Sequence, residues 1–377
     1  LEAVGSVGLD DDFFDLGGHS LLVVKVVNRI RELVGADLSV NDLFDNSTVE
    51  DLAQLIDPAR QAGRVESFAN FVELEQLPVA DAAPVHTDPR SVLLTGATGF
   101  LGSYLVRELV DHTTAEIVCL VRASTPEDGL ARIEASMRKF GAWHDGDAAR
   151  IVALPGDLAA PRLGLSPDTF AELSERIDTI VHNGARVNHI ETYRRMHDAN
   201  VESTKELLRI ASAHHLKPVH FVSTGSVLNA PERNADGSRH LAFEDDRLEP
   251  EVLMNSGYVQ TKWVGEEIVR LAAAQGVPVS IYRPGLITGD IVTGACATED
   301  AFWNMVRAIV ALGMIPDVAQ HGGVAMTPVN YVASALVALA LKPESWGGTY
   351  NLVAQRDAQM VDLEEQLRVH GFGLRSA

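Results

Sequence analysis

The hydrophobic and polar positions divide the chain into two parts with different periodicities. In residues 1–57, apolar residues recur at intervals of three or four, which is typical of helices that bury one face. Ser47-Thr48-Val49-Glu50 matches the capping-box pattern and predicts a last short helix that ends near Ile56. One face of the longest predicted helix carries Leu22, Val26, Ile30 and Leu33. We therefore expect a small all-α unit over residues 1–57.

Residues 58–90 follow neither periodicity. They contain four prolines spread among Ala, Glu and Asp, a composition that predicts a linker. Within the linker, Phe68–Leu77 is apolar enough to form a short segment docked on the next domain.

From Ser91 onward, short apolar runs alternate with helical patterns, which predicts a parallel sheet covered by helices on both faces. The predicted strands are Val92–Thr95, Glu116–Arg122, Ile151–Leu154, Thr179–His182, Val219–Ser223 and Val279–Arg283. Ala301–Leu312 and Tyr331–Leu341 are predicted helices, and Thr349–Val353 is a late strand. We expect an α/β fold: a small all-α domain, then a Rossmann-like, doubly wound parallel sheet with a smaller substrate-side region.

The first predicted strand runs into a turn with glycines at G-x-x-G-x-x-G spacing and then into a helix. Such a helix start has unpaired N–H groups and a dipole that favours an anion. Glycines there let a pyrophosphate approach the backbone, although an ordinary tight turn has the same residues. We predict a dinucleotide site formed by Thr95, Gly96, Thr98, Gly99, Phe100, Leu101 and Gly102.

Arg122, at the end of the second predicted strand, stands where an NAD-dependent enzyme usually has Asp or Glu. A guanidinium suits the 2′-phosphate of NADPH through forked, charge-assisted hydrogen bonds. Arg132 on the following helix is a second candidate contact; a solvated strand-end arginine is the alternative for Arg122.

The ends of the third and fourth predicted strands supply further candidates. Asp157 and Leu158 follow the third strand, where Asp157 suits the adenine edge or, alternatively, caps the next segment. Asn183, Gly184 and Ala185 follow the fourth strand and are expected along the cofactor ribose. Since ligands of such sheets bind beyond the carboxyl ends of the strands, all these residues are expected at one edge.

Tyr258 and Lys262 are four residues apart and share one face of a predicted helix. An ammonium beside a phenol favours the phenolate and makes the phenol a better proton donor to a developing alkoxide. Thr224, at the end of the fifth predicted strand, adds a hydroxyl donor to the same oxygen. Alone, such a pair is more typical of a helix surface; with the glycine turn upstream, it predicts a catalytic centre.

Composition excludes several classes of protein. The net charge of −21 argues against a nucleic-acid surface, and residues 1–57 hold twelve Asp or Glu against three Lys or Arg. That acidic unit favours docking on basic partner surfaces. Cys119 and Cys296 form no disulfide framework, and no cluster has metal-ligand spacing. The sequence shows no signal peptide or membrane span, so we expect a cytoplasmic protein with no membrane partner and no metal.

The motif DDFFDLGGHSLL, residues 11–22, closely resembles the phosphopantetheine attachment motif of peptidyl carrier domains from nonribosomal peptide synthetases. The resemblance implies that Ser20 carries 4′-phosphopantetheine, attached by a phosphopantetheinyl transferase, with an acyl or peptidyl thioester at its tip. By position alone, Ser20 is an N-cap serine, and the two roles are compatible.

TGATGFLG, VHNGA, VSTGS and YVQTK together resemble the extended short-chain dehydrogenase/reductase family. HNGARVN, behind a carrier, resembles its thioester reductase branch, the terminal release domains of peptide synthetases. The resemblance covers nearly all of residues 91–353. It implies NADPH-dependent release of the thioester as an aldehyde, with a second hydride transfer to an alcohol left open, and adenylation and condensation domains upstream. It makes Thr224, Tyr258 and Lys262 catalytic, places Asn188 near the nicotinamide or the substrate, and places Tyr282, Pro284 and Gly285 near the nicotinamide.

The expected organisation is an N-terminally truncated peptidyl carrier domain (1–57), a linker (58–90), an NADP-binding Rossmann reductase domain (91–285) and a substrate-side region (286–377) that ends early for such a reductase. A carboxylic acid reductase has the same domain order, but GGHS favours a peptide synthetase. A cyclising release domain without redox chemistry typically lacks the tyrosine. No G-x-S-x-G elbow of a thioesterase occurs, and a docking module alone leaves the second part unexplained.

Overall fold

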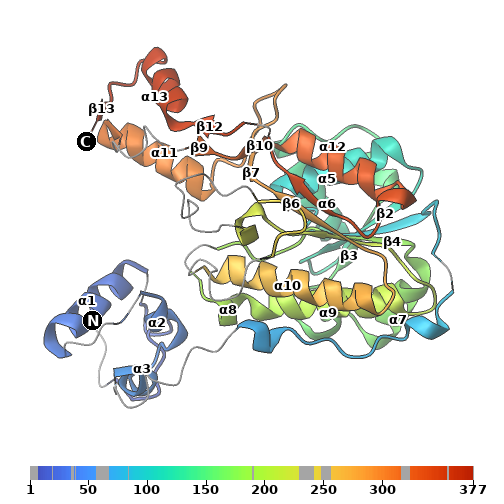
Figure 1. Ribbon diagram of the computed structural model, residues 1–377, viewed down its shortest axis with the longest axis horizontal. Coiled ribbons are helices and arrows are strands. Elements are labelled where there is room, and N and C mark those ends of the chain that lie inside the picture. The colour runs from blue at the N-terminus through green and yellow to red at the C-terminus, as the bar shows by residue number, and fades with distance from the viewer. Residues whose placement is uncertain are drawn as a thin grey trace.

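The structure is a computed structural model of the 377-residue chain (Figure 1). It describes residues 7–18, 20–34, 38, 40–56, 68–83, 85–188, 191–228, 242–247, 256–315, 323–354 and 356–376. The described N-terminal part is a small helical unit, and a larger α/β unit follows it.

The N-terminal unit contains three helices, α1 (Ser20–Val34), α2 (Val40–Asp45) and α3 (Val49–Ile56). Its core contains Val23, Val27, Leu38, Leu43 and Phe44. The expected stripe on α1 is therefore partly wrong: Val23 and Val27 are buried and Leu33 is 68% exposed. Apolar residues occur on more than one side of α1, so spacing alone does not say which side packs. Thr48, rather than Ser47, caps α3 by accepting a hydrogen bond from the Asp51 N–H at 3.1 Å.

The α/β unit is built on a seven-stranded sheet in which all paired strands are parallel. Its order is β11-β6-β5-β4-β1-β2-β3: β2 and β3 are added on one side of β1, and β4 and the later strands on the other, so the strand order reverses between β1 and β4. Ligands of such sheets bind at this reversal. The strands are β1 (Ser91–Thr95), β2 (Glu116–Val121), β3 (Ile151–Pro155), β4 (Thr179–His182), β5 (Val219–Val222), β6 (Val279–Pro284) and β11 (Thr349–Leu352).

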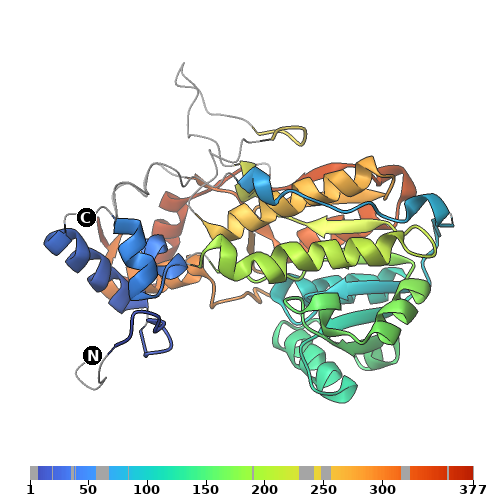
Figure 2. The same ribbon diagram turned by 90° about the horizontal axis from the view of Figure 1, so that it is seen from below.

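Helices cover both faces of this sheet, as the alternation of strands and helices predicts (Figures 1 and 2). Val92 and Leu94 of β1 pack in one hydrophobic cluster and Leu93 in the other, because neighbouring strand residues face opposite sides. One face carries α5 (Phe100–His112), α6 (Pro126–Lys139) and α12 (Val329–Ala340). The other carries α7 (Pro167–Arg176), α8 (Tyr193–His197), α9 (Ser203–Ser212) and α10 (Gly257–Ala274).

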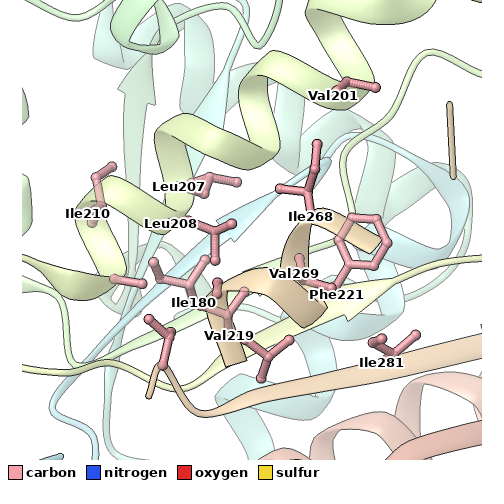
Figure 3. Packing of buried hydrophobic residues seen from close by; sticks show 14 of the residues in the cluster. Ile180, Val201, Leu207, Leu208, Ile210, Val219, Phe221, Ile268, Val269 and Ile281 are labelled. Carbon is pink, nitrogen blue, oxygen red and sulfur yellow. The ribbon is translucent and has the colours of Figure 1, made fainter. Parts of the chain in front are cut away.

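Figure 3 shows the second cluster from close by: side chains of β4, β5 and β6 meet those of α9 and α10. Phe221, Val219 and Ile281 supply the sheet side, and Leu208 and Ile268 are among the helix residues that cover it. Burial of these side chains fixes α10 on the sheet with one face inward.

The region after residue 285 contributes to the main sheet. Strand β11 pairs in parallel with β6, and α12 packs on the first cluster, so the predicted division at 285 does not follow the sheet. Other described elements of this region are β7 (Leu286–Thr288), α11 (Ala301–Leu312), β8 (Met314–Ile315), β9 (Gly323–Val324), β10 (Met326–Pro328), β12 (Ala358–Gln359), α13 (Met360–Val369) and β13 (Arg375–Ser376).

The linker docks on the α/β unit, as predicted for Phe68–Leu77. Phe68 and Phe71 contact the Tyr193 ring, with centroids 5.3 and 4.8 Å away. Leu77 is buried, and its N–H donates to Oε1 of Gln275 at 2.7 Å. Residues 68–77 thus lie along the face that carries α8 and α10.

None of the helices in the described ranges combines the length and apolar character that a membrane crossing requires.

A buried ion pair joins α10 to the sheet. Arg283 of β6 donates from Nε to Oε1 of Glu266 at 2.9 Å and from Nη2 to Oε2 at 2.7 Å. The two residues are 1% and 2% exposed. Arg283 also donates to the carbonyls of Glu244 and Asp246. Loss of one partner would leave a buried charge with fewer hydrogen bonds.

We predict that Arg283→Met lowers the free energy of unfolding of the α/β unit by about 3–5 kcal/mol, the usual cost of breaking a buried pair. Arg138→Met is the control: Arg138 forms an exposed i,i+4 pair with Glu134, worth less than about 1 kcal/mol. Urea unfolding followed by tryptophan fluorescence measures both. Equal losses in the two variants would contradict a structural role for the buried pair.

Candidate active site

The turn between β1 and α5 is tightly packed and has no room for side chains on Gly96 and Gly102. Gly96 has a φ of +75°, and a Cβ on it would lie 2.7 Å from Cα of Gly184. A Cβ on Gly102 would lie 1.9 Å from the Gly96 carbonyl oxygen. Helix α5 therefore starts directly against the turn, as in dinucleotide-binding folds.

The first turn of α5 fits an anionic ligand. Its N-cap is Gly99, which is exposed and provides no side-chain cap. The N–H groups of the first turn thus have no side-chain acceptor at the cap and can donate to a pyrophosphate. Thr98, Phe100 and Leu101 complete the predicted stretch; Phe100 is half-buried against Phe140 and Leu101 is buried.

A hydrogen-bonded chain beneath the turn connects β1 to β4. The Gly184 N–H donates to Oγ1 of Thr95 at 2.8 Å, and Oγ1 lies 2.9 Å from Nδ1 of His182. Nε2 of His182 lies 3.1 Å from Oγ1 of Thr204. Thr95 is fully buried, so its side chain supports the turn from below. Asn183 donates from Nδ2 to the Gly96 carbonyl at 3.4 Å, which brings the predicted ribose segment to the turn.

The residues after β3 lie beside the same turn. A Cβ on Gly184 would lie 2.7 Å from Cδ1 of Leu158, so this leucine packs over the close approach. Asp157 is exposed, and its Oδ1 accepts from the Ala159 N–H at 3.0 Å. The local turn that was the alternative for Asp157 is therefore present, and contact with adenine stays a prediction.

Arg122 and Arg132 lie together at the carboxyl end of β2. Nη1 of Arg132 donates to the Arg122 carbonyl oxygen, although the residues are ten apart in sequence. Both are exposed: Arg122 directly follows β2, the strand next to β1, and Arg132 lies on α6. The structure thus brings the two predicted phosphate contacts to one place beside the turn.

Tyr258 and Lys262 lie in the first turns of α10, whose inner face packs against β5. Lys262 is 2% exposed, and its Nζ lies 4.5 Å from the centre of the Phe221 ring, a cation–π contact. Tyr258 is partly exposed. Thr224 follows β5, and its Oγ1 accepts from the Ser226 N–H at 3.3 Å. All three belong to the elements at the carboxyl ends of the central strands.

Burial controls the protonation states in this centre. It raises the pKa of Tyr258 to about 12 and lowers the pKa of Lys262 to about 8, the latter partly offset by Glu266. Burial, together with the Lys262 charge, lowers the pKa of His182 to about 3. Desolvation keeps Tyr258 a neutral phenol in this state, which is the form that donates a proton, and the effect of the Lys262 ammonium on the phenolate stays a prediction.

Three positioning residues were not predicted from the sequence. Asn200, which is buried, donates to the Arg186 carbonyl and to Oγ1 of Thr261 and accepts from the Arg186 N–H, so it connects the loop after β4 to α10. Glu266 and Arg283 hold α10 on β6. The only sequence signal was the placement of Glu266 four residues after Lys262, on one helix face.

The remaining predicted residues occupy varied environments. Tyr282 is fully buried, and its Oη lies 2.9 Å from Nδ1 of His220. Its side chain therefore packs in the core, in the cluster on the sheet face that carries α5 and α12. Pro284 ends β6, and a Cβ on Gly285 would lie 2.4 Å from the Ala325 carbonyl oxygen. Asn188 accepts from the Glu191 N–H at 3.1 Å. Ala185 is partly exposed beside Gly184.

Comparison with known proteins identifies the two parts. Residues 94–336 match the NAD-binding family described as male sterility protein, and residues 1–56 match the phosphopantetheine attachment site family. The chain belongs to the NAD-binding family described as male sterility protein, whose model matches more than half of its length. The N-terminal unit is hereafter the carrier (residues 1–57), and the α/β unit the reductase (residues 91–377).

Comparison with solved structures agrees with these family matches. The terminal R domain of the myxalamid PKS-NRPS pathway is 41% identical, with a TM-score of 0.77 over 82% of this chain and 78% of that one. A thiolation-reductase di-domain of an archaeal non-ribosomal peptide synthetase is 25% identical, with a TM-score of 0.73 over 99% and 80%. These neighbours confirm the Rossmann-like fold and the relationship to terminal reductase domains of peptide synthetases.

Among curated proteins, a linear gramicidin synthase polypeptide of Brevibacillus parabrevis is 38% identical over 98% of this chain. The match covers 7% of that protein, so the chain spans a small part of its relative's length.

In the carrier, Ser20 is the first residue of α1, at the end of a hydrogen-bonded loop. The Gly18 N–H donates to the Phe13 carbonyl at 2.8 Å, and a Cβ on Gly18 would lie 2.3 Å from the Phe13 ring. The loop thus presents the attachment serine at a helix start, the position that the sequence predicts.

In the described part of the chain, one group has donors close enough for a metal ion: His86, Asp178 and His215. It precedes β1, β4 and β5, at the sheet edge opposite the predicted catalytic residues Tyr258 and Lys262. Cys119 is buried and Cys296 half-buried.

We predict that Gly102→Ala weakens NADPH binding on the order of tenfold or more, since the new methyl must displace the Gly96 carbonyl and reshape the turn. Gly373→Ala is the control, because a Cβ there meets nothing within 4 Å. Titration of NADPH fluorescence measures both affinities. Unchanged affinity in Gly102→Ala would show that the cofactor does not use this turn.

Proposed function

We propose that this chain releases an acyl or peptidyl group from Ser20 by reducing its thioester to an aldehyde. The observation that carries the proposal is the placement of Tyr258 and Lys262 on α10, at the sheet edge where the glycine turn follows β1. A carrier in the same chain supports it, since the family provides the attachment serine that would hold the substrate.

Reduction of the thioester uses one hydride and one proton, and it breaks the C–S bond. The products are an aldehyde and a free thiol. NADPH supplies the hydride. Thr224 and Tyr258 donate hydrogen bonds to the thioester oxygen as negative charge develops on it, and Tyr258, a neutral phenol, transfers its proton there. The hemithioacetal then collapses and the thiol leaves.

Lys262 supplies the positive charge that stabilises the phenolate left after this transfer. Its ammonium is held by the Phe221 ring and by the negative charge of Glu266, one helical turn away. Since burial lowers its pKa to about 8, Lys262 is charged at neutral pH and loses that charge at moderately alkaline pH.

The cofactor preference rests on Arg122 and Arg132. Two guanidinium groups beside the end of β2 suit the 2′-phosphate that distinguishes NADPH from NADH. The predicted contacts at the turn, at Asp157 and Leu158, and along Asn183–Asn188 complete the cofactor site. Because the substrate is tethered to the same chain, its effective concentration at the site is set by the length of the linker and of the phosphopantetheine arm.

The proposal includes partners outside this chain. A phosphopantetheinyl transferase modifies Ser20, and adenylation and condensation domains upstream supply the acyl or peptidyl group. We infer a cytoplasmic location and no nucleic-acid or membrane partner; the net charge of −21 supports the absence of nucleic acid.

The decisive experiment loads Ser20 with a model acyl-pantetheine and follows NADPH absorbance. Oxidation of NADPH but not of NADH, with an aldehyde product, is expected. Tyr258→Phe should lose at least about a hundredfold in turnover, the usual contribution of a general acid, and keep its NADPH affinity. Product release without oxidation would instead support the cyclising alternative, and unchanged turnover would remove Tyr258 from the mechanism.

We predict that the single-turnover rate is constant from pH 6 to about 7.5 and falls above about pH 8, as the Lys262 ammonium is lost. Tyr258 stays protonated throughout this range, because its pKa is about 12. Lys262→Met should be slower and show no such fall.

Lys217→Met is the matched control for this pH profile. The pKa of Lys217 is also lowered to about 8 by burial, but Lys217 precedes β5 at the opposite sheet edge. This variant should keep the alkaline fall. A wild-type rate that stays constant to pH 10 would contradict the role of Lys262.

A further inference from the structure

The carrier and the reductase meet through an arginine and an aromatic ring. Cζ of Arg195, on α8 of the reductase, lies 4.7 Å from the centre of the Phe14 ring of the carrier. The carrier lies at the α8 end of the reductase in both views (Figures 1 and 2). Arg195 is exposed, so the reductase core does not need its side chain.

Phe14 presents one ring face to this contact. Its ring is stacked on Phe44 of the carrier, with centroids 5.2 Å apart and planes at 11°. One face therefore packs in the carrier core, and the other is available to the guanidinium. Phe13 meets the same ring edge-on at 5.1 Å, which fixes the orientation of the face that Arg195 covers.

The loop that carries Phe14 leads directly to the attachment serine and is held by hydrogen bonds. Oδ1 of Asp12 accepts from the N–H groups of Phe14 and Asp15, at 2.7 and 3.2 Å. Gly17 donates to the Phe14 carbonyl at 3.0 Å, one residue before Gly18 is anchored on Phe13. A contact at Phe14 thus fixes the position of the start of α1, where Ser20 lies.

On the reductase side, α8 adjoins the catalytic helix. A Cβ on Gly257, the residue before Tyr258, would lie 2.3 Å from the backbone of Thr192 and 2.4 Å from that of Tyr193. The start of α8 and the start of α10 are therefore in direct backbone contact. A carrier held at Arg195 is held beside the helix that carries Tyr258.

Charge favours the same arrangement. The carrier has an excess of nine acidic residues, twelve Asp or Glu against three Lys or Arg. Its Asp12 lies within the field of Arg195: burial raises the pKa of Asp12, but hydrogen bonds from Ser47, Phe14 and Asp15, together with the Arg195 charge, lower it overall. Helix α8 carries two adjacent arginines, Arg194 and Arg195.

We propose that Arg195 on α8 is the recognition residue for the carrier, and that its cation–π contact with Phe14 defines the pose in which Ser20 delivers the thioester to the reductase. The proposal rests on the proposed function for the meaning of that delivery. The partner that Arg195 recognises is a carrier with an aromatic ring six residues before the attachment serine and with an acidic surface.

The first test compares carrier-bound and soluble substrates. In Arg195→Glu, the single-turnover reduction of an acyl group on Ser20 should fall roughly 3- to 30-fold, the range of a cation–π contact. Reduction of a soluble acyl-pantetheine thioester should not change. Lys342→Glu, an exposed charge reversal after α12, is the control and should affect neither rate. Equal losses on both substrates in Arg195→Glu would overturn the proposal.

The second test is a double-mutant cycle with the carrier. Phe14→Leu keeps an apolar side chain against Phe44 but removes the π face. It should lower the carrier-bound rate by a similar factor, and the double variant should lose no more than Arg195→Glu alone, because both changes remove one contact. Multiplicative losses in the double variant would contradict direct coupling.

A third measurement does not depend on activity. Hydrogen exchange of the α8 amides, residues 193–197, should be faster in Phe14→Leu than in the wild type, since the docked carrier protects them. If α8 exchange is unchanged, the docked pose is wrong, whatever the enzyme reduces. If α8 responds as expected but neither thioester is reduced, the docking stands and the proposed function fails.

Discussion

The close approach of two backbone segments at the carboxyl ends of β1 and β4 is the constraint on which this structure depends. Gly96 and Gly184 are so near that a Cβ on Gly96 would lie 2.7 Å from Cα of Gly184, and a Cβ on Gly184 would lie 3.0 Å from the Gly96 nitrogen. Glycine is the only residue that fits, and the same lack of side chains leaves the start of α5 open to an anion. The chain from Thr95 through His182 to Thr204 fixes this approach from below. Cofactor binding and sheet packing are thus two results of one steric requirement.

Helix α10, which carries the proposed catalytic residues, is positioned on this sheet by polar contacts inside an apolar face. Phe221 and its neighbours hold α10 against the sheet, while the buried pair of Arg283 and Glu266 fixes its placement along β6. Burial then sets the protonation states: it keeps Tyr258 protonated and brings Lys262 close to losing its proton. The carrier completes the arrangement, because its loop meets α8, and α8 adjoins the first residue of α10.

Much of this was predictable from sequence, because strands and turns have local signatures. The strand Thr179–His182 was predicted to the residue, and the other six predicted strands were placed within one residue at each end. The glycine spacing and the Tyr258–Lys262 interval pointed to one sheet edge. What depended on distant contacts was missed. The pair of Arg283 and Glu266 and the hydrogen bonds of Asn200 connect different elements of the fold. The burial of Tyr282 likewise depends on residues from other elements. The buried side of α1 was also unpredictable, since Leu22 and Val23 are equally apolar.

The central claim is that a hydride reduces the Ser20-bound thioester. The most direct test loads Ser20 with an acyl group, adds NADPH deuterated at C4 of the nicotinamide, on the face from which hydride leaves, and analyses the released product by mass spectrometry. The account predicts an aldehyde with deuterium on its carbonyl carbon and an equal amount of NADP⁺. A released acid or a cyclised product without deuterium would contradict it.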